Sequence, residues 1–288
     1  MRSCCNIHVQ IVFPCVLLGT ASVCVEAHQP ASADDESSTQ VVAETQLFNG
    51  TDLSGWTTWL VDEKRDDPRG VFRVHDGLLH ISGDGFGYLV TKKAYRDYRL
   101  VAEYKWGDKN WQHRQGKARD SGIFVHVGGP DGNSYDAQGA YKAGIECQIM
   151  EGATGDLMLI RGRGDDGRDI PLRATARVGD KPDDDEWPYW SPDGKPRTLK
   201  LWGRVNWREK DPTWKDEFGY RGQNDVTAKP GQWTRLECRC TGSRIQVFVN
   251  DKQVNEMFDV FPSGGQILIQ CEGSEIDFRR IELRPLGK

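Results

Sequence analysis

A short strand-like segment carries the residues best suited to acid–base chemistry. Side chains alternate along an extended chain, so within residues 144–151 Glu146 and Gln148 share one side, while Cys147 and Ile149 share the other. We expect Glu146 and Gln148 to be candidate site residues on one polar face; the simpler alternative is an outer strand whose polar side faces water.

A second predicted strand, at residues 121–127, places His126 on the same side as Gly122 and Phe124. Imidazole titrates near neutral pH, which suits proton transfer, so His126 is the second catalytic candidate. A single histidine at a strand end is more commonly a hydrogen-bonded structural residue, and the sequence leaves both interpretations open.

Two further polar pairs have the spacing of one strand face. Glu103 and Lys105 lie in one predicted strand, and Gln270 and Glu272 lie in another near the carboxyl end. If these strands neighbour the strand of Glu146, the pairs line one polar concave face. We therefore predict that all four residues bind substrate.

The elements that must position these residues are strands. Apolar residues recur in short alternating runs separated by Gly, Asp, Asn and Pro, and no window has the long amphipathic pattern of a capped helix. The 32 Gly and 10 Trp suit many strands and tight turns. The expected fold class is all-β, a two-sheet antiparallel sandwich of jelly-roll type.

A polar stretch at about 162–230 interrupts this pattern, and we expect it to be a long Trp-rich loop insertion. Its tryptophans either plug its underside or form a platform beside a binding groove, because Trp rings stack on sugars and loops carry function on rigid sandwiches. The five tryptophans are Trp187, Trp190, Trp202, Trp207 and Trp214.

The amino-terminal region has the form of an export signal followed by a linker. Residues 1–27 contain Arg2, an apolar run and small residues near Ala27, which is typical of a secretory signal peptide; polar interruptions disfavour a transmembrane anchor. Residues 28–46 predict a disordered linker, and 47–288 the jelly-roll domain. We therefore expect an exported protein, periplasmic or extracellular, with no membrane span after signal cleavage.

Composition and motifs exclude several classes of function. A net charge of −5 without a basic block argues against nucleic acid as a partner. The chain has no GxSxG elbow, HExxH zinc helix, GxxxxGK[ST] phosphate loop or dinucleotide fingerprint. Cysteines beyond the signal are expected mainly as strand residues, although their even number permits disulfides in an exported protein. They are Cys147, Cys238, Cys240 and Cys271.

Several motifs together resemble the 3-keto-disaccharide hydrolase family. They are LFNGTDLSGW, DGLLHISGDGFGYLVTKKAYRDYRLVAEYKW, the SGI of DSGIFVH, GIECQIME and GGQILIQCEGSEIDFRRIELRPL, between Leu47 and Leu286. The resemblance implies a concanavalin A-like jelly roll in an exported bacterial protein that cleaves 3-keto-glycosides. The implied partner is an oligosaccharide or glycoside substrate.

This resemblance also implies a mechanism. A ketone at sugar C3 acidifies the C2 proton, so a base can remove that proton and the C1 substituent can leave. Glu146 would be the base, with His126 as the alternate base or as the acid for the leaving oxygen. Lys105 or a bound divalent metal ion would stabilise the enolate, and Gln148, Gln270 and Glu272 would bind ring hydroxyls of the substrate. No cofactor is otherwise implied.

The chain departs from the family pattern at two positions. Asp120 stands where the motif usually has Asn, and His126 stands where Arg is common. The sequence also leaves two other functions open. A retaining glucanase would use Glu146 and Glu151, although such strands carry an acid where this chain has Gln148. A carbohydrate-binding module would use the polar face without catalysis.

Overall fold

The computed structural model describes residues 40–41, 43–135, 139–199 and 203–286. The predicted signal peptide and residues 28–39 of the predicted linker lie outside the described residues. Among the described residues, no helix has the length and apolar character that crossing a bilayer requires. The described residues all belong to one unit, Ser37–Lys288.

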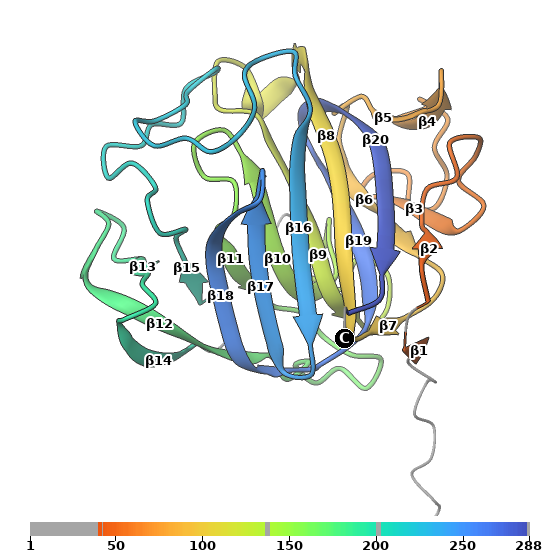
Figure 1. Cartoon of the computed structure of the whole chain (residues 1–288). Helices are drawn as coiled ribbons and strands as arrows, with labels where there is room; N and C mark the ends of the chain where they lie inside the picture. The colour runs from red at the N-terminus through yellow and green to blue at the C-terminus, as the bar shows by residue number, and fades with distance from the viewer. Residues whose placement is uncertain (1–39, 42, 136–138, 200–202, 287–288) are drawn as a thin grey trace, which may run out of the picture. The chain divides into compact units, whose positions relative to one another are not determined.

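This unit consists of two antiparallel sheets packed face to face, with the larger sheet in front in Figure 1. In spatial order the smaller sheet contains β15 (Arg204–Val205), β11 (Leu157–Ile160), β10 (Ala143–Met150), β9 (Asp120–Gly128), β19 (Gln266–Glu272), β6 (Phe86–Thr91) and β3 (Trp56–Leu60). The larger sheet contains β13 (Pro188–Trp190), β12 (Arg173–Pro182), β18 (Lys252–Phe261), β17 (Arg244–Val249), β16 (Thr234–Thr241), β8 (Tyr98–Asn110), β20 (Ser274–Arg284), β5 (Leu78–Ile81) and β4 (Phe72–His75). β14 (Lys195–Leu199) pairs with β12, β2 (Thr45–Gln46) pairs with β20, and a short 3-10 helix spans Gln112–Arg114. The predicted all-β sandwich is confirmed.

One apolar core fills the space between the sheets, and strand alternation supplies it. In β10 the side chains of Ile145, Cys147 and Ile149 enter this core, and in β9 those of Ile123 and Val125 do so. The intervening side chains of both strands therefore point to the opposite face of the smaller sheet. The cysteines of the described residues lie in strands, as the sequence predicts, and their buried thiols are free: Cys147, Cys238, Cys240 and Cys271.

The segment predicted as a loop insertion also contributes strands to both sheets. β12, β13 and β14 extend one edge of the larger sheet, and β15 extends the smaller one. Trp190 and Trp207 are buried in the sandwich core, whereas Trp187 is half-buried and lines a cavity on the smaller sheet. These tryptophans thus differ in role, two packing inward and one lying beside a cavity; Trp202 lies outside the described residues.

The folded domain begins earlier than the predicted boundary at Leu47. β1 (Gln40–Val41) pairs in parallel with β7 (Tyr95–Arg96), and β2 pairs with β20 through Thr45 opposite Leu283. Backbone hydrogen bonds to a neighbouring strand need no apolar alternation, so the polar sequence of this segment did not reveal the pairings.

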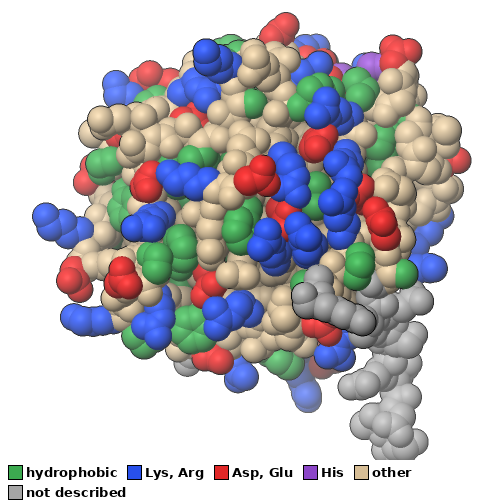
Figure 2. Space-filling model, viewed as in Figure 1, with side chains coloured by type: hydrophobic (Ala, Val, Ile, Leu, Met, Phe, Trp, Pro, Cys, Tyr) green, Lys and Arg blue, Asp and Glu red, His purple; other side chains and the backbone are tan. Residues whose placement is uncertain are grey.

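The exposed face of the larger sheet carries a ladder of arginines and glutamates, visible as the blue and red side chains gathered in Figure 2. Glu103 pairs with Arg279 and Arg280, and the ammonium of Lys105 lies over the ring of Trp233. Glu103 and Lys105 therefore do not share a face with Glu146, and the prediction that they line its polar face is wrong. Strand parity had placed the two residues on one side of β8 without revealing which sheet β8 joins.

Candidate active site

The outward face of the smaller sheet carries polar side chains from three adjacent strands, which we call the polar face: Asp120, Glu146, Gln148, Gln270 and Glu272. β9 lies between β10 and β19, with Gly122 opposite Gln148 and Phe124 opposite Glu146. The five side chains line one cavity of about 260 Å³. The structure thus brings four residues predicted from the sequence together: Glu146, Gln148, Gln270 and Glu272.

Gly122 provides the space in which two of these side chains meet. A methyl group at this position would lie 2.5 Å from Glu146 Oε1 and 2.9 Å from Gln270 Oε1. The two side chains come from strands on either side of β9 and bend over the glycine. Any larger residue at 122 would occupy the space in which their oxygen atoms converge.

Asp120 adds a second carboxyl group on the same side of β9 as Gly122. It is buried, with Oδ2 3.7 Å from Arg114 Nη1, and its backbone N–H donates to Ser274 Oγ. Burial, and then the neighbouring Glu272 carboxylate, raise the pKa of Asp120 well above its usual range. Asp120 is therefore suited to hold a proton, whereas Glu146 would accept one. Asp120 and Gly122 are two residues apart on one strand, so the alternation of side chains could have identified Asp120 as a member of this face from the sequence.

Arg204 and Tyr141 complete the polar side of the cavity, and no sequence pattern pointed to either. Arg204 lies on β15 and pairs with the fully buried Asp156, which also accepts the N–H of Trp207. The Tyr141 hydroxyl is buried, and burial followed by the charges of Glu272, Asp120 and Glu146 raises its pKa well above the usual value. A neutral phenol and a guanidinium therefore face the carboxyl groups.

An apolar floor continues the same face of the sheet. Its members pack together as a cluster separate from the sandwich core and include Tyr88, Val90, Phe124, Tyr141, Ile160 and Leu268. Trp187 borders the cavity from the loop after β12, where its N–H and that of Asp185 donate to Asp183 Oδ1. Polar groups beside apolar and aromatic surface are what a sugar ring requires of a binding site.

Several buried oxygen atoms of this cavity have no hydrogen-bond partner among the described residues. They are Asp120 Oδ1, Gln148 Oε1, Gln270 Oε1 and the Tyr141 hydroxyl. Each such atom costs about 1–3 kcal/mol when it is left without a partner. A ligand rich in hydroxyl groups would supply the missing partners.

His126 does not point into this cavity, so its predicted place on the same side as Gly122 is wrong. The residue sits where the pairing of β9 with β19 and with β10 is irregular, and it has a left-handed φ of 56°. This bulge breaks the strand alternation and turns the imidazole toward the ring of Tyr98, a core residue of the larger sheet. Burial lowers the pKa of His126 to about 4.

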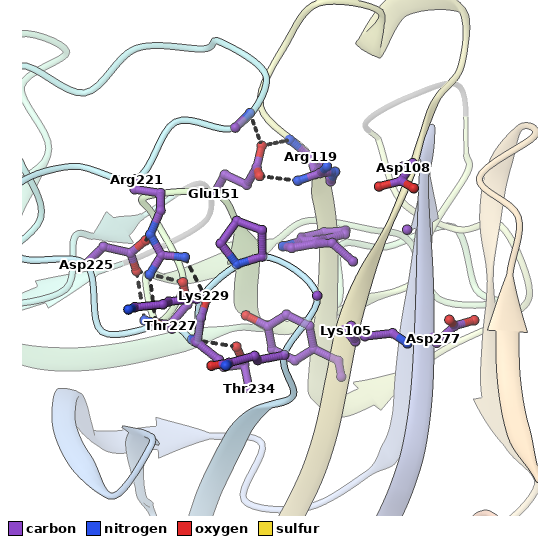
Figure 3. Close-up of a pocket in the computed structure, with 18 of the residues that line it drawn as sticks. Lys105, Asp108, Arg119, Glu151, Arg221, Asp225, Thr227, Lys229, Thr234 and Asp277 are labelled. Carbon is purple, nitrogen blue, oxygen red and sulfur yellow. Dashed lines mark hydrogen bonds and ion pairs between the residues drawn. The ribbon is translucent and has the colours of Figure 1, made fainter.

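A second cavity, of about 320 Å³, lies between β8 and the loop that precedes β16 (Figure 3). We call it the loop cavity. Glu151 lines it and is held by the guanidinium and N–H of Arg119 and by the N–H of Gly219. Arg221 pairs with Asp225 and donates to the carbonyls of Thr227 and Ala228. Although this cavity is larger, its Glu151 and Arg221 side chains already bind other groups of the protein.

The position of Glu151 bears on the glucanase alternative. Glu151 lines the loop cavity, and Glu146 lines the cavity of the polar face. A retaining pair of carboxyl groups must lie about 5–5.5 Å apart across one substrate. The pair of Glu146 and Glu151 that a retaining glucanase would need therefore does not line one cavity.

A comparison with protein families identifies the family of this chain. A family model of the 3-keto-alpha-glucoside-1,2-lyase-like domain matches residues 43–284. The chain belongs to this family. It is therefore a carbohydrate-active domain of glycosyl hydrolase-like type, as the motifs at its two ends indicated. A comparison with curated proteins gave no match.

Several solved structures show a distant similarity to this family member. A candidate glycosyl hydrolase from Parabacteroides distasonis is 16% identical, covers 85% of this chain and 94% of its own, and has a TM-score of 0.46. A β-glucanase from Bacillus licheniformis is 8% identical over 86% and 100% of the two chains, with a TM-score of 0.41. The carbohydrate-binding module CBM66 from Bacillus subtilis is 12% identical over 79% and 93%, with a TM-score of 0.37.

Proposed function

We propose that this protein is exported and cleaves 3-keto-glycosides on the polar face, with Glu146 as the base that removes the C2 proton. The observation that carries the proposal is the convergence of Glu146 Oε1 and Gln270 Oε1 over Gly122, inside a cavity whose described residues leave buried oxygen atoms without partners. Family membership supports the substrate class. Export to the periplasm or the extracellular space rests on the signal-like residues 1–27.

The proposed reaction is an elimination. Glu146 takes the C2 proton, and the electrons of the C–H bond move into an enolate whose charge rests on the C3 oxygen. The enolate then re-forms the C3 carbonyl, a C1=C2 double bond forms, and the C1–O bond breaks. The leaving oxygen takes a proton, which leaves a 2-hydroxyglucal with a C3 ketone; water can add to it and complete a net hydrolysis.

Residues around Glu146 match the remaining steps. Asp120 is the proposed acid for the leaving oxygen, because burial and Glu272 favour its protonated form. The Arg204 guanidinium and the Tyr141 hydroxyl are the proposed partners of the enolate oxygen, a role that Lys105 cannot take from the other sheet. Gln148, Gln270 and Glu272 would bind ring hydroxyls.

The test is release of the aglycone from a 3-keto-glucoside and from the matching unoxidised glucoside. We expect release from the keto substrate alone, and Glu146→Gln should lower kcat/KM by roughly a thousandfold because an amide does not accept the proton. Glu103→Gln is the matched control: it removes a carboxylate of the exposed ladder and should leave kcat/KM unchanged.

The other outcomes separate the competing functions. Release from both glucosides would point to a conventional glycosidase and contradict the elimination. Binding of either glucoside without release would point to a carbohydrate-binding module. Full activity in Glu146→Gln would show that another residue is the base.

A further inference from the structure

We propose that the larger sheet holds a divalent transition-metal ion between His75, His80 and Asp277. One nitrogen of each imidazole and one carboxylate oxygen lie within 4.8 Å of one another. Among the described residues, this is the one group of three such side chains that meets this distance. The proposal is independent of the carbohydrate chemistry, because none of these residues lines the cavity of the polar face.

Three neighbouring strands bring these residues together. His75 ends β4, just before the turn at Asp76 and Gly77 that leads into β5. His80 lies on β5 opposite Arg73, and therefore diagonally from His75 on one side of the hairpin. Asp277 lies on β20 directly opposite His80. The site would join a peripheral hairpin to a central strand.

The state of His80 is the second observation that points to a ligand. Its side chain is 7% exposed, and Nδ1 lies 2.8 Å from Asp277 Oδ1. Nε2 is buried and has no hydrogen-bond partner among the described residues. Nδ1 therefore lies beside the carboxylate with which it would share the ion, and the buried Nε2 is left for an outer partner.

A further acidic group is oriented toward the same imidazole. Glu275 Oε2 accepts the backbone N–H groups of Asp108 and Lys109, which leaves Oε1 3.7 Å from His80 Nε2. Gly107 makes room for this carboxylate, because a methyl group there would lie 2.3 Å from Glu275 Oε2. Such an outer carboxylate orients metal-binding imidazoles in many sites.

The donor set selects the kind of ion. Two imidazoles and a carboxylate suit Zn²⁺, Co²⁺ or Ni²⁺, with solvent in the remaining position. Ca²⁺ and Mg²⁺ prefer oxygen ligands and should bind weakly. The nearby Lys105 ammonium is directed to the Trp233 ring, 4.9 Å from its centre.

The test is calorimetric titration of the full-length, tag-free protein with Zn²⁺ and, separately, with Ca²⁺. We expect one Zn²⁺ per chain and no comparable Ca²⁺ binding. His75→Ala and Asp277→Asn should each weaken Zn²⁺ binding by about a hundredfold. His75 is 46% exposed, so its replacement should leave metal-free thermal unfolding unchanged.

The matched control is His113→Ala, which removes another exposed histidine and should bind Zn²⁺ like the wild type. Visible absorption of bound Co²⁺ provides a second readout, and it should disappear in His75→Ala. The proposal is overturned if the wild type binds no Zn²⁺, if Ca²⁺ binds equally well, or if both ligand variants retain wild-type affinity.

Discussion

The polar-face cavity and the loop cavity are similar in size, but they differ in how far their polar groups are hydrogen-bonded within the protein. In the loop cavity, Glu151 is satisfied by Arg119 and Gly219, and Arg221 by Asp225 and two carbonyls. Of the buried side-chain polar atoms lining it, only Arg119 Nε lacks a partner among the described residues. In the polar-face cavity, four oxygen atoms of the described residues lack one.

The presence or absence of hydrogen-bond partners within the protein distinguishes a structural cavity from a binding site. Polar groups that hold a loop in place bind one another when the chain folds. Polar groups that bind a ligand keep part of their hydrogen-bonding capacity for it, at a cost in stability. By this criterion the smaller cavity is the better candidate for the site, and substitutions in the two cavities should have different consequences.

The largest expected effect is on stability, in the loop cavity. Glu151→Gln would leave the buried Arg119 without its counter-charge, so the free energy of unfolding should fall by about 3–5 kcal/mol. Urea denaturation measures the loss. Turnover of a 3-keto-glucoside per folded molecule should stay near wild type. A stable but inactive Glu151→Gln protein would move the active site to the loop cavity.

A smaller effect, on activity alone, is expected at Gly122. Gly122→Ala inserts a methyl group between the ends of two flexible side chains, so they should shift and kcat/KM should drop about a hundredfold. Gly128→Ala, on the same strand with nothing within 4 Å of the added methyl group, is the control and should be fully active. Equal activity in the two variants would contradict the convergence over Gly122.

The pH dependence of stability should report on Asp120. Because its pKa is raised in the folded state, the folded protein keeps a proton that the unfolded chain releases above the usual Asp pKa. The free energy of unfolding should therefore decline as pH rises through this window, by up to about 1.4 kcal/mol per pH unit. Asp120→Asn should remove that decline in urea denaturation between pH 4 and 8; an unchanged slope would show that Asp120 is not its source.

The smallest expected effect is on the free energy of unfolding, and it has opposite signs in the two cavities. Gln270→Met replaces an amide that includes an unsatisfied oxygen, so it should stabilise the protein by about 1 kcal/mol while raising KM. Thr234→Val removes the acceptor of the Ala228 N–H in the loop cavity and should destabilise by about 1 kcal/mol with KM unchanged. Thermal unfolding and steady-state kinetics of both variants check these signs.

The sequence predicted the fold and part of the polar face for one physical reason. A strand's period of two determines which residues share a side, so Glu146 with Gln148, and Gln270 with Glu272, were placed together correctly. The same rule does not say which strands are neighbours, and so Glu103 and Lys105 were assigned to the wrong sheet.

The remaining differences between the sequence-based predictions and the structure arise where the local backbone departs from a regular strand. His126 follows the period in the sequence, but a bulge with a left-handed φ turns its side chain into the interior. Tyr141 precedes its strand, and Arg204 lies in the two-residue β15, so neither belongs to a periodic pattern. Tertiary packing alone brings these two residues to the site.

The most direct test of the central claim follows a deuterium label at C2 of a 3-keto-glucoside while the aglycone is released. If Glu146 removes the C2 proton, the wild type should lose one C2 label for each glycosidic bond cleaved, whether or not water adds afterwards. Glu146→Gln should lose the label no faster than buffer alone. Release of the aglycone with the C2 label retained would contradict the account.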